Sequence, residues 1–216
     1  MKTLFCLALG VGTALAQTSQ IESCASCHGP HGEGNPQMGA PRLAGQPQPY
    51  LERQLEAYAT GRRYNEVMVP IARALTAADR AQLAAIYAHL DAPPTRRSAA
   101  TGATRGSPRA RKLATEGDES RQVQACENCH GPGGSGFGGV VPYLAGQDAR
   151  YLETALQEWK QGRRDTDPTG VMPQIAKRLT DPDIAALAAY YASLPPQASQ
   201  KTRPGASQGP GGASPR

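Results

Sequence analysis

The chain has 216 residues, a net charge of +5 and an aromatic content of 5%, which allows one domain or two small ones. Small domains with few large apolar side chains need a disulfide, a metal or a large buried group to hold them together. Residues 17–91 and 116–194 carry net charges of −1 and −4, so the positive charge lies on the segments around them. This distribution argues against nucleic-acid binding.

Residues 1–16 are expected to be a signal peptide. Lys2 precedes an apolar run over 4–15, and the run ends in a small-x-small cleavage pattern that closes at Ala16. The run is short for a bilayer span, although an uncleaved anchor is the alternative. Cys6 stands before the run is complete, which does not fit a lipoprotein. We therefore expect export to the periplasm as a soluble protein.

The remaining chain contains an internal repeat with an offset of 101 to 104 residues. The matching stretches include Cys-Ala-Ser-Cys-His at 24–28 and Cys-Glu-Asn-Cys-His at 126–130, Leu-Ala-Gly-Gln at 43–46 and 144–147, and Gly-Arg-Arg at 61–63 and 162–164. The repeat predicts two tandem domains over 17–91 and 111–194. A basic, flexible linker over 92–110 is expected to join them, and a disordered tail over 195–216 to follow.

Both copies are expected to be helical, because their loops are rich in Gly and Pro and lack strand alternation. Apolar spacing predicts helices over 49–60 and 150–161, each closed by a glycine. Thr76 and Thr180 each have an aspartate three residues later, a pattern typical of a capping box. A short helix over about 111–125 is expected to lead into the second copy.

The chemistry of the chain is concentrated in the doubled Cys-x-x-Cys-His motif, which is the attachment signature of c-type haem. Two thiols on one helical turn can each bond a porphyrin vinyl group, and the following histidine then faces the iron. A redox dithiol, a zinc site and a strained disulfide are the alternatives. The motif predicts two haem c groups, each with its iron. The attachment cysteines would be Cys24, Cys27, Cys126 and Cys129, and the iron-ligating histidines His28 and His130.

Each iron needs a sixth ligand unless it binds gas. After its motif the second copy has one methionine, Met172, and no histidine. Met68 stands at the equivalent place in the first copy, 44 residues after the first cysteine of its motif against 46 for Met172. The alternatives Met38, His31 and His89 lack counterparts in the second copy. Thioether ligation favours ferrous iron, so Met68 and Met172 would raise the reduction potentials.

The ordered pattern of haem motif, Pro-x-Leu-x-Gly, methionine and terminal helix resembles class I cytochromes c. The resemblance implies that a proline carbonyl accepts the proton of the ligating histidine, that a leucine packs on the haem, and that an aromatic residue meets the leading helix. The matching residues are Pro41 and Leu43, Pro142 and Leu144, and Tyr87 and Tyr191.

Two such domains in one chain resemble the dihaem cytochrome c4 family. That resemblance implies an all-α fold of two tandem class I domains, each wrapped around a covalent haem, and a periplasmic electron carrier that can feed a terminal oxidase. The leading helix of the first copy is expected to be curtailed to about 17–23. This feature and the basic linker put tight packing of the two domains in doubt.

We expect an electron carrier that works with redox protein partners and can dock at a membrane complex, rather than an enzyme. The alternative is the electron-accepting subunit of a periplasmic dehydrogenase complex. A peroxidase or gas sensor needs an open iron site, against which the repeated methionine argues. Arginines that follow the first long helix of each copy are expected to pair with haem propionates or to be solvated: Arg62, Arg63, Arg163 and Arg164.

Overall fold

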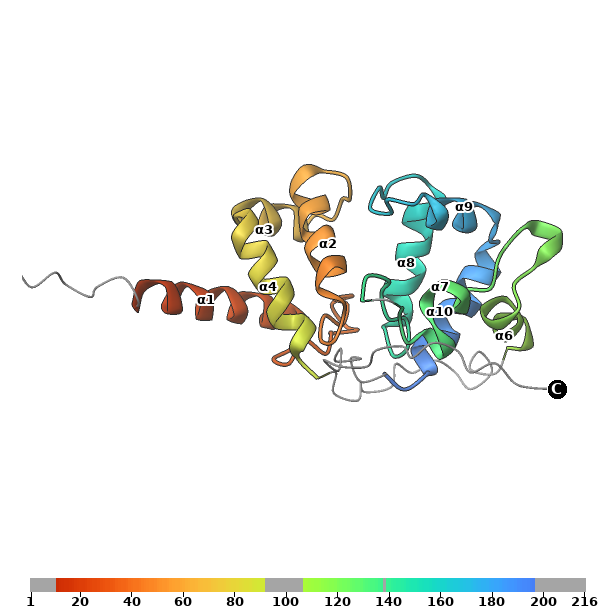
Figure 1. Cartoon of the computed structure of the whole chain (residues 1–216), viewed down its shortest axis with the longest axis horizontal. Coiled ribbons are helices and arrows are strands. Elements are labelled where there is room, and N and C mark those ends of the chain that lie inside the picture. The colour runs from red at the N-terminus through yellow and green to blue at the C-terminus, as the bar shows by residue number, and fades with distance from the viewer. Residues whose placement is uncertain (1–10, 92–106, 138, 197–216) are drawn as a thin grey trace, which may run out of the picture.

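The computed structural model describes residues 11–91, 107–137 and 139–196, which form two helical domains side by side (Figure 1). Within these ranges there are isolated bridges between single residues but no extended strand. Most of the expected leader, the stretch 92–106 of the expected linker and the tail 197–216 lie outside the described residues. The fold is therefore all-α, as predicted.

The first domain consists of four helices. They are α1 (Val11–His28), α2 (Gln48–Thr60), α3 (Met68–Ala74) and α4 (Ala77–His89). The first Cys-x-x-Cys-His motif forms the last turns of α1, and the expected cleavage site after Ala16 falls within the same helix. Removal of the leader would thus shorten α1 without reaching the motif.

The second domain repeats this order with one change at its start. Its elements are α6 (Pro108–Thr115), η1 (Glu119–Arg121), α7 (Glu127–His130), η2 (Pro132–Gly134), α8 (Ala149–Lys160), α9 (Val171–Arg178) and α10 (Asp181–Ser193). The single helix expected over about 111–125 is not formed. In its place α6 begins before residue 111 and ends at Thr115, and the second Cys-x-x-Cys-His motif lies on the separate short helix α7. Gly117, at a φ of +84°, turns the chain between them, where a Cβ would meet the backbone of Val123.

The other predicted helices are confirmed to within a residue or two. Gly61 closes α2 at a φ of 78°, in the left-handed conformation that glycine adopts without strain. Thr76 begins α4 and Thr180 begins α10 with complete capping boxes, in which each threonine side chain accepts a hydrogen bond from the aspartate N–H three residues on. Local sequence chemistry thus sets the end of α2 and the starts of α4 and α10.

The carboxylate of Asp183 ties the start of the second domain to α10. It accepts hydrogen bonds from Arg109 on α6 and, at 2.7 Å, from Arg121 on η1, and the Asp183 side chain is fully buried. Burial acts to raise the pKa of Asp183, but the hydrogen bonds from the two arginines hold it well below its usual range. Hydrogen bonds from Ser120 and Arg121 likewise lower the pKa of Asp118 to about 2. Arg109, expected in the flexible linker, is instead part of the folded domain.

Among the side chains that the structure describes, the larger hydrophobic cluster lies in the second domain. In the second, α6 packs on α10 and Leu113 joins a cluster with Leu187 and Tyr191. In the first, Tyr87 of α4 packs with Leu51 and against Cys24 of α1 in a smaller cluster.

The domains are joined through residues that the repeat makes equivalent. The Gln46 side chain donates to the Tyr143 carbonyl at 2.9 Å and accepts from the Tyr143 N–H at 3.0 Å. Gln147, its counterpart, does the same with the backbone of Arg42, at 3.0 and 2.8 Å. Arg63 and Arg164 face each other across an isolated antiparallel bridge. Such reciprocal contacts are those of a two-fold symmetric interface.

This interface brings the two domains into close contact, although two features of the sequence had put tight packing in doubt. Gln46, Arg42, Gln147 and Tyr143 are all buried. The contacts come from loops and helices inside each repeat, so they depend neither on the linker nor on the length of the leading helix. Both features that raised the doubt are therefore irrelevant to the packing.

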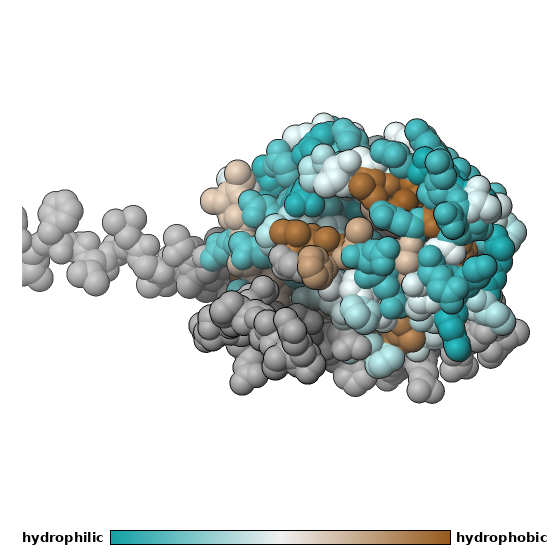
Figure 2. Space-filling view, turned by 45° about the vertical axis from the view of Figure 1, so that its right-hand side comes forward, coloured by the Kyte–Doolittle hydropathy of each residue, from teal (hydrophilic) through white to brown (hydrophobic). Residues whose placement is uncertain are grey.

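The surface is mostly hydrophilic, with small separate hydrophobic patches on the face seen in Figure 2. The large apolar side chains that remain exposed include Met38 and Val67 in the first domain and Phe137 and Val140 in the second. Among the helices of the described ranges, none has the length and apolar character needed to cross a bilayer.

Candidate functional site

A cavity of about 380 Å³ lies in the first domain and one of about 420 Å³ in the second, and each is lined in part by residues of the other domain. Both volumes lie in the range of small-molecule and cofactor sites. The helices that follow the two motifs supply most of the apolar lining, such as Leu51 and Ile71 in the first cavity and Leu152 and Ile175 in the second.

One wall of each cavity carries the cysteines and the histidine of the motif. His28 Nδ1 donates to the Pro41 carbonyl at 2.8 Å, and His130 Nδ1 donates to the Pro142 carbonyl at 2.9 Å. With Nδ1 protonated and held, Nε2 is the free ring nitrogen of each histidine and is available to a metal. These are the bonds that the resemblance to class I cytochromes c implies, and Leu43 lines the first cavity beside them.

Burial favours the neutral forms of the motif histidines and of Cys126. It lowers the pKa of His28 and of His130, against the opposing effect of the hydrogen bonds to Pro41 and Pro142. Burial also raises the pKa of the Cys126 thiol to about 11. A neutral imidazole is the form that ligates iron.

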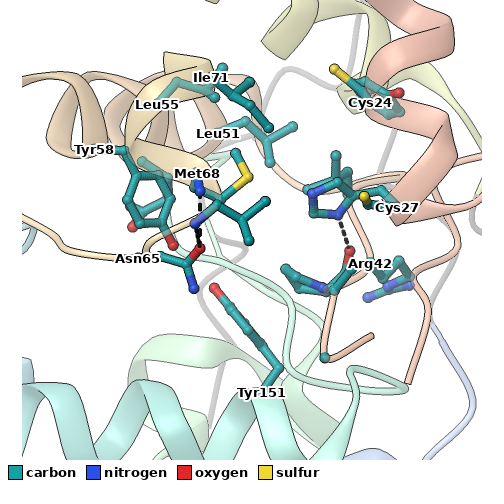
Figure 3. A pocket seen from close by; sticks show the side chains of 18 of the residues that line it. Cys24, Cys27, Arg42, Leu51, Leu55, Tyr58, Asn65, Met68, Ile71 and Tyr151 are labelled. Carbon is teal, nitrogen blue, oxygen red and sulfur yellow. Dashed lines mark hydrogen bonds between the residues drawn. The ribbon is translucent and has the colours of Figure 1, made fainter. Parts of the chain in front are cut away.

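The opposite wall carries the methionine that sequence reasoning selected. Figure 3 shows Met68 across the first cavity from Cys24 and Cys27. Met172 at the start of α9 lines the second cavity together with His130.

Two residues that sequence reasoning missed hold the methionine backbone. The Asn65 side chain accepts from the N–H groups of Val67 and Met68, both at 3.0 Å. Asp167 accepts from the Met172 N–H at 2.7 Å. The sequence signal for these contacts is an asparagine or aspartate shortly before each methionine. Its spacing from the methionine differs slightly between the two copies, and this difference hides that the two residues are equivalent.

The rival ligands are less well placed than Met68. Met38 is 58% exposed at the rim of the first cavity. His31 and His89 are exposed, and His89 Nδ1 bonds the Ala85 carbonyl of its own helix. The four cysteines are free thiols, and no cluster of three or more His, Cys, Asp or Glu is found in the part of the chain that the structure describes.

Between the two cavities lies a buried polar cluster. The hydroxyls of Tyr50 and Tyr151, which line both cavities, share a hydrogen bond of 3.3 Å. Arg63 donates to Glu158 at 3.0 Å and to Gln54 at 3.1 Å, so an ion pair crosses the interface. Figure 3 shows Tyr151 reaching the first cavity from the second domain.

The second arginine of the cluster has a different environment. Arg164 donates to Gln54 at 2.8 Å and to Thr166 at 3.0 Å, and its guanidinium lies 4.6 Å from the centre of the Trp159 ring. It lines the second cavity, and none of the ion pairs among the described residues involves it. Of the four arginines considered for haem propionates, Arg63 and Arg164 are thus buried, whereas Arg62 and Arg163 are exposed.

The residues present fit a haem in each cavity. In each largely apolar cavity, a pair of cysteines lies at one wall and a histidine with a free Nε2 lies beside it. A methionine lies at the opposite wall. The buried Arg42 Nε and Nη1 have no hydrogen-bond partner among the described residues, as expected where an anionic group completes the site. Fold and site together define a dihaem c-type cytochrome.

Comparison with known proteins supports this class. The family model described as cytochrome c matches residues 12–92 and again 114–195. A thiosulfate dehydrogenase electron acceptor from Thiomonas intermedia is 42% identical over 186 residues, covering 83% of this chain and 82% of that protein. The crystal structure of reduced cytochrome c4 from Pseudomonas stutzeri aligns with a TM-score of 0.73 at 29% identity, over 84% of this chain and 98% of that one.

A thiosulfate dehydrogenase, TsdBA, from Marichromatium purpuratum aligns with a TM-score of 0.74 at 43% identity and covers 80% of this chain. This chain spans only 36% of the length of that protein. The chain belongs to the cytochrome c family and, within it, to the dihaem cytochromes c4. It is an electron-carrying cytochrome with two covalently bound haem c groups.

Proposed function

We propose that this chain accepts electrons from a separate periplasmic dehydrogenase, for which thiosulfate is the favoured substrate, and passes them to a respiratory partner. The observation that carries the proposal is the facing pair of histidine and methionine in both domains. When bound, each haem supplies a one-electron ferric–ferrous couple, so one chain would hold two electrons. Sequence relatives at 42% and 39% identity are named thiosulfate dehydrogenase electron acceptors, which favours thiosulfate oxidation as the source.

The ligand assignment is part of this proposal. Cys24 and Cys27 would hold the first haem covalently, with His28 and Met68 on the two faces of its iron. The corresponding residues of the second site are Cys126, Cys129, His130 and Met172. The carbonyls of Pro41 and Pro142 fix the histidines, and the methionines would fill the ligand position that a substrate or gas would otherwise need. The chain would therefore carry electrons and perform no substrate chemistry.

Export is the third part of the proposal. Haem c is attached outside the cytoplasm, and the sequence begins with the pattern of a cleaved leader. Mass spectrometry of the purified protein should give a chain that begins at Gln17 and carries two haems. A chain that retains residues 1–16 would contradict cleavage, and a mass with one haem would contradict attachment at both motifs.

A direct test mixes the oxidised protein with a purified thiosulfate dehydrogenase and follows the visible spectrum. We expect both haems to become reduced when thiosulfate is added and to stay oxidised when the dehydrogenase is omitted. Residues 116–194 carry a net charge of −4, and α6 adds the three cations Arg109, Arg111 and Lys112 to the same domain. Reduction rates should therefore depend on ionic strength if this uneven charge guides docking. Reduction by thiosulfate alone would contradict a pure carrier role. No reduction with the dehydrogenase present would favour the alternative of a carrier between other respiratory partners.

A further inference from the structure

The Arg42 side chain is a buried cation in the wall of the first cavity. It is 2% exposed and lies between Pro41 and Leu43, in a loop that lines the first cavity. Figure 3 places it on the same side of that cavity as Cys27. Arginine is almost never fully buried without a partner, so the environment of this guanidinium needs an explanation.

The second domain holds Arg42 in place. The backbone N–H and carbonyl of Arg42 bond the Gln147 side chain at 2.8 and 3.0 Å, and Arg42 Nη2 donates to the Ala145 carbonyl at 3.1 Å. All of these partners are neutral. None of the ion pairs between described residues includes Arg42, in contrast to Arg63, which pairs with Glu158.

Two of its donor groups remain without a partner. Arg42 Nε and Nη1 are buried and make no hydrogen bond to any described residue. Burial lowers the pKa of Arg42 to about 10, while Tyr143 nearby has the opposite effect, so the group stays charged at neutral pH. A buried charge of this kind is strongly destabilising unless an anion faces it.

The cavity beside Arg42 is that of the first haem, and the anionic groups of a haem are its propionates. We propose that Arg42 binds a propionate of the first haem through Nε and Nη1. The counterpart of Arg42 in the second domain is Tyr143, a neutral and nearly buried residue, so the second haem lacks this charge. Because Ala145 and Gln147 hold the guanidinium, the second domain completes the site of the first haem.

The proposal predicts an effect on one haem only. A positive charge near the haem favours the ferrous state, so Arg42→Leu should lower the reduction potential of the first haem and leave that of the second nearly unchanged. Arg42→Lys keeps the charge and should restore most of the loss. Arg62→Leu is the matched control, because it removes an exposed cation of the same domain, and it should shift neither potential.

A second pair of variants tests the role of the other domain. Gln147→Leu removes the bonds that hold the Arg42 backbone, whereas Gln46→Leu removes the equivalent bonds at Tyr143. Both weaken the interface to a similar degree, but only Gln147→Leu should lower the potential of the first haem. Equal shifts from the two variants would mean that Arg42 acts merely through domain packing and would overturn the proposal.

The decisive experiment is a spectroelectrochemical titration of the haem-loaded protein and these variants. The first haem is identified as the one whose potential falls in Met68→His. A fall of that same potential in Arg42→Leu, reversed in Arg42→Lys, supports the proposal. No shift, or a shift of the other haem, overturns it. If Met68→His lowers neither potential, the assignment of Met68 as an iron ligand is wrong. The proposal for Arg42 is then judged by Arg42→Leu alone: a fall of one potential supports it, and no fall overturns it.

Discussion

The ion pair between Arg63 and Glu158 should be the strongest polar contact between the domains. Its Nε–Oε2 distance is 3.0 Å, and the side chains are only 3% and 11% exposed. Breaking a buried pair by removing one partner costs about 3–5 kcal/mol, because the remaining charge stays buried. After Glu158→Ala, Arg63 keeps its bonds to Gln54 and to the Tyr151 hydroxyl. We therefore expect the lower value, about 3 kcal/mol.

This loss can be measured as a fall in thermal stability. For a cooperative unit of 150–250 residues, about 3 kcal/mol corresponds to a fall in Tm of about 6–12 °C. Glu158→Gln should lose less, since its amide oxygen can still accept from Arg63. Glu153→Ala is the control, because Glu153 is an exposed carboxylate on the same helix, α8. Circular dichroism melts of the ferric, haem-loaded proteins in which Glu158→Ala and Glu153→Ala coincide would refute the reasoning.

Three further outcomes are expected. Met68→His should lower the reduction potential of one haem and Met172→His that of the other, because imidazole favours ferric iron more than thioether does. A spectroelectrochemical titration in which one substitution lowers both potentials would contradict the assignment of these methionines as iron ligands. Asp183→Ala should destabilise the chain by about 3 kcal/mol in denaturant titrations, and Asp79→Ala, at the equivalent but exposed capping box, by much less. The hydrogen bonds to Asp183 and Asp118 hold the pKa of each carboxyl in the folded protein below its unfolded-state value of about 3.9. Their contribution to stability should therefore be fully present above that value and be lost as the pH falls through the folded-state pKa. Thermal melts between about pH 5 and 2 that show no such loss would contradict this prediction.

Local sequence chemistry predicted the parts of the fold that depend on neighbouring residues. The helix periods, the glycine that ends α2 and the capping boxes at Thr76 and Thr180 are set within a few positions of the chain. The cysteine motif and the position of Met172 followed from the repeat, because two copies of one pattern limit the ligands that both can share. These features need no knowledge of distant contacts.

The domain interface could not be predicted in this way. Gln46 and Gln147 are polar residues in loops, and nothing local indicates that each bonds the backbone of the other domain. Nothing in the sequence around Arg42 indicates that its side chain is buried, since a guanidinium is buried only where groups distant in the chain surround it. Both cases depend on contacts about a hundred residues apart.

The central claim is that the chain carries electrons at two haems, each ligated by histidine and methionine. Reductive titration of the purified protein, followed in the visible region, tests it most directly. The account predicts two reversible one-electron steps, both at the raised potentials that methionine ligation gives. It also predicts a ferrous spectrum that does not change when carbon monoxide is added and a ferric spectrum that does not change when peroxide is added. A single step, or an iron that binds these ligands readily, would contradict it.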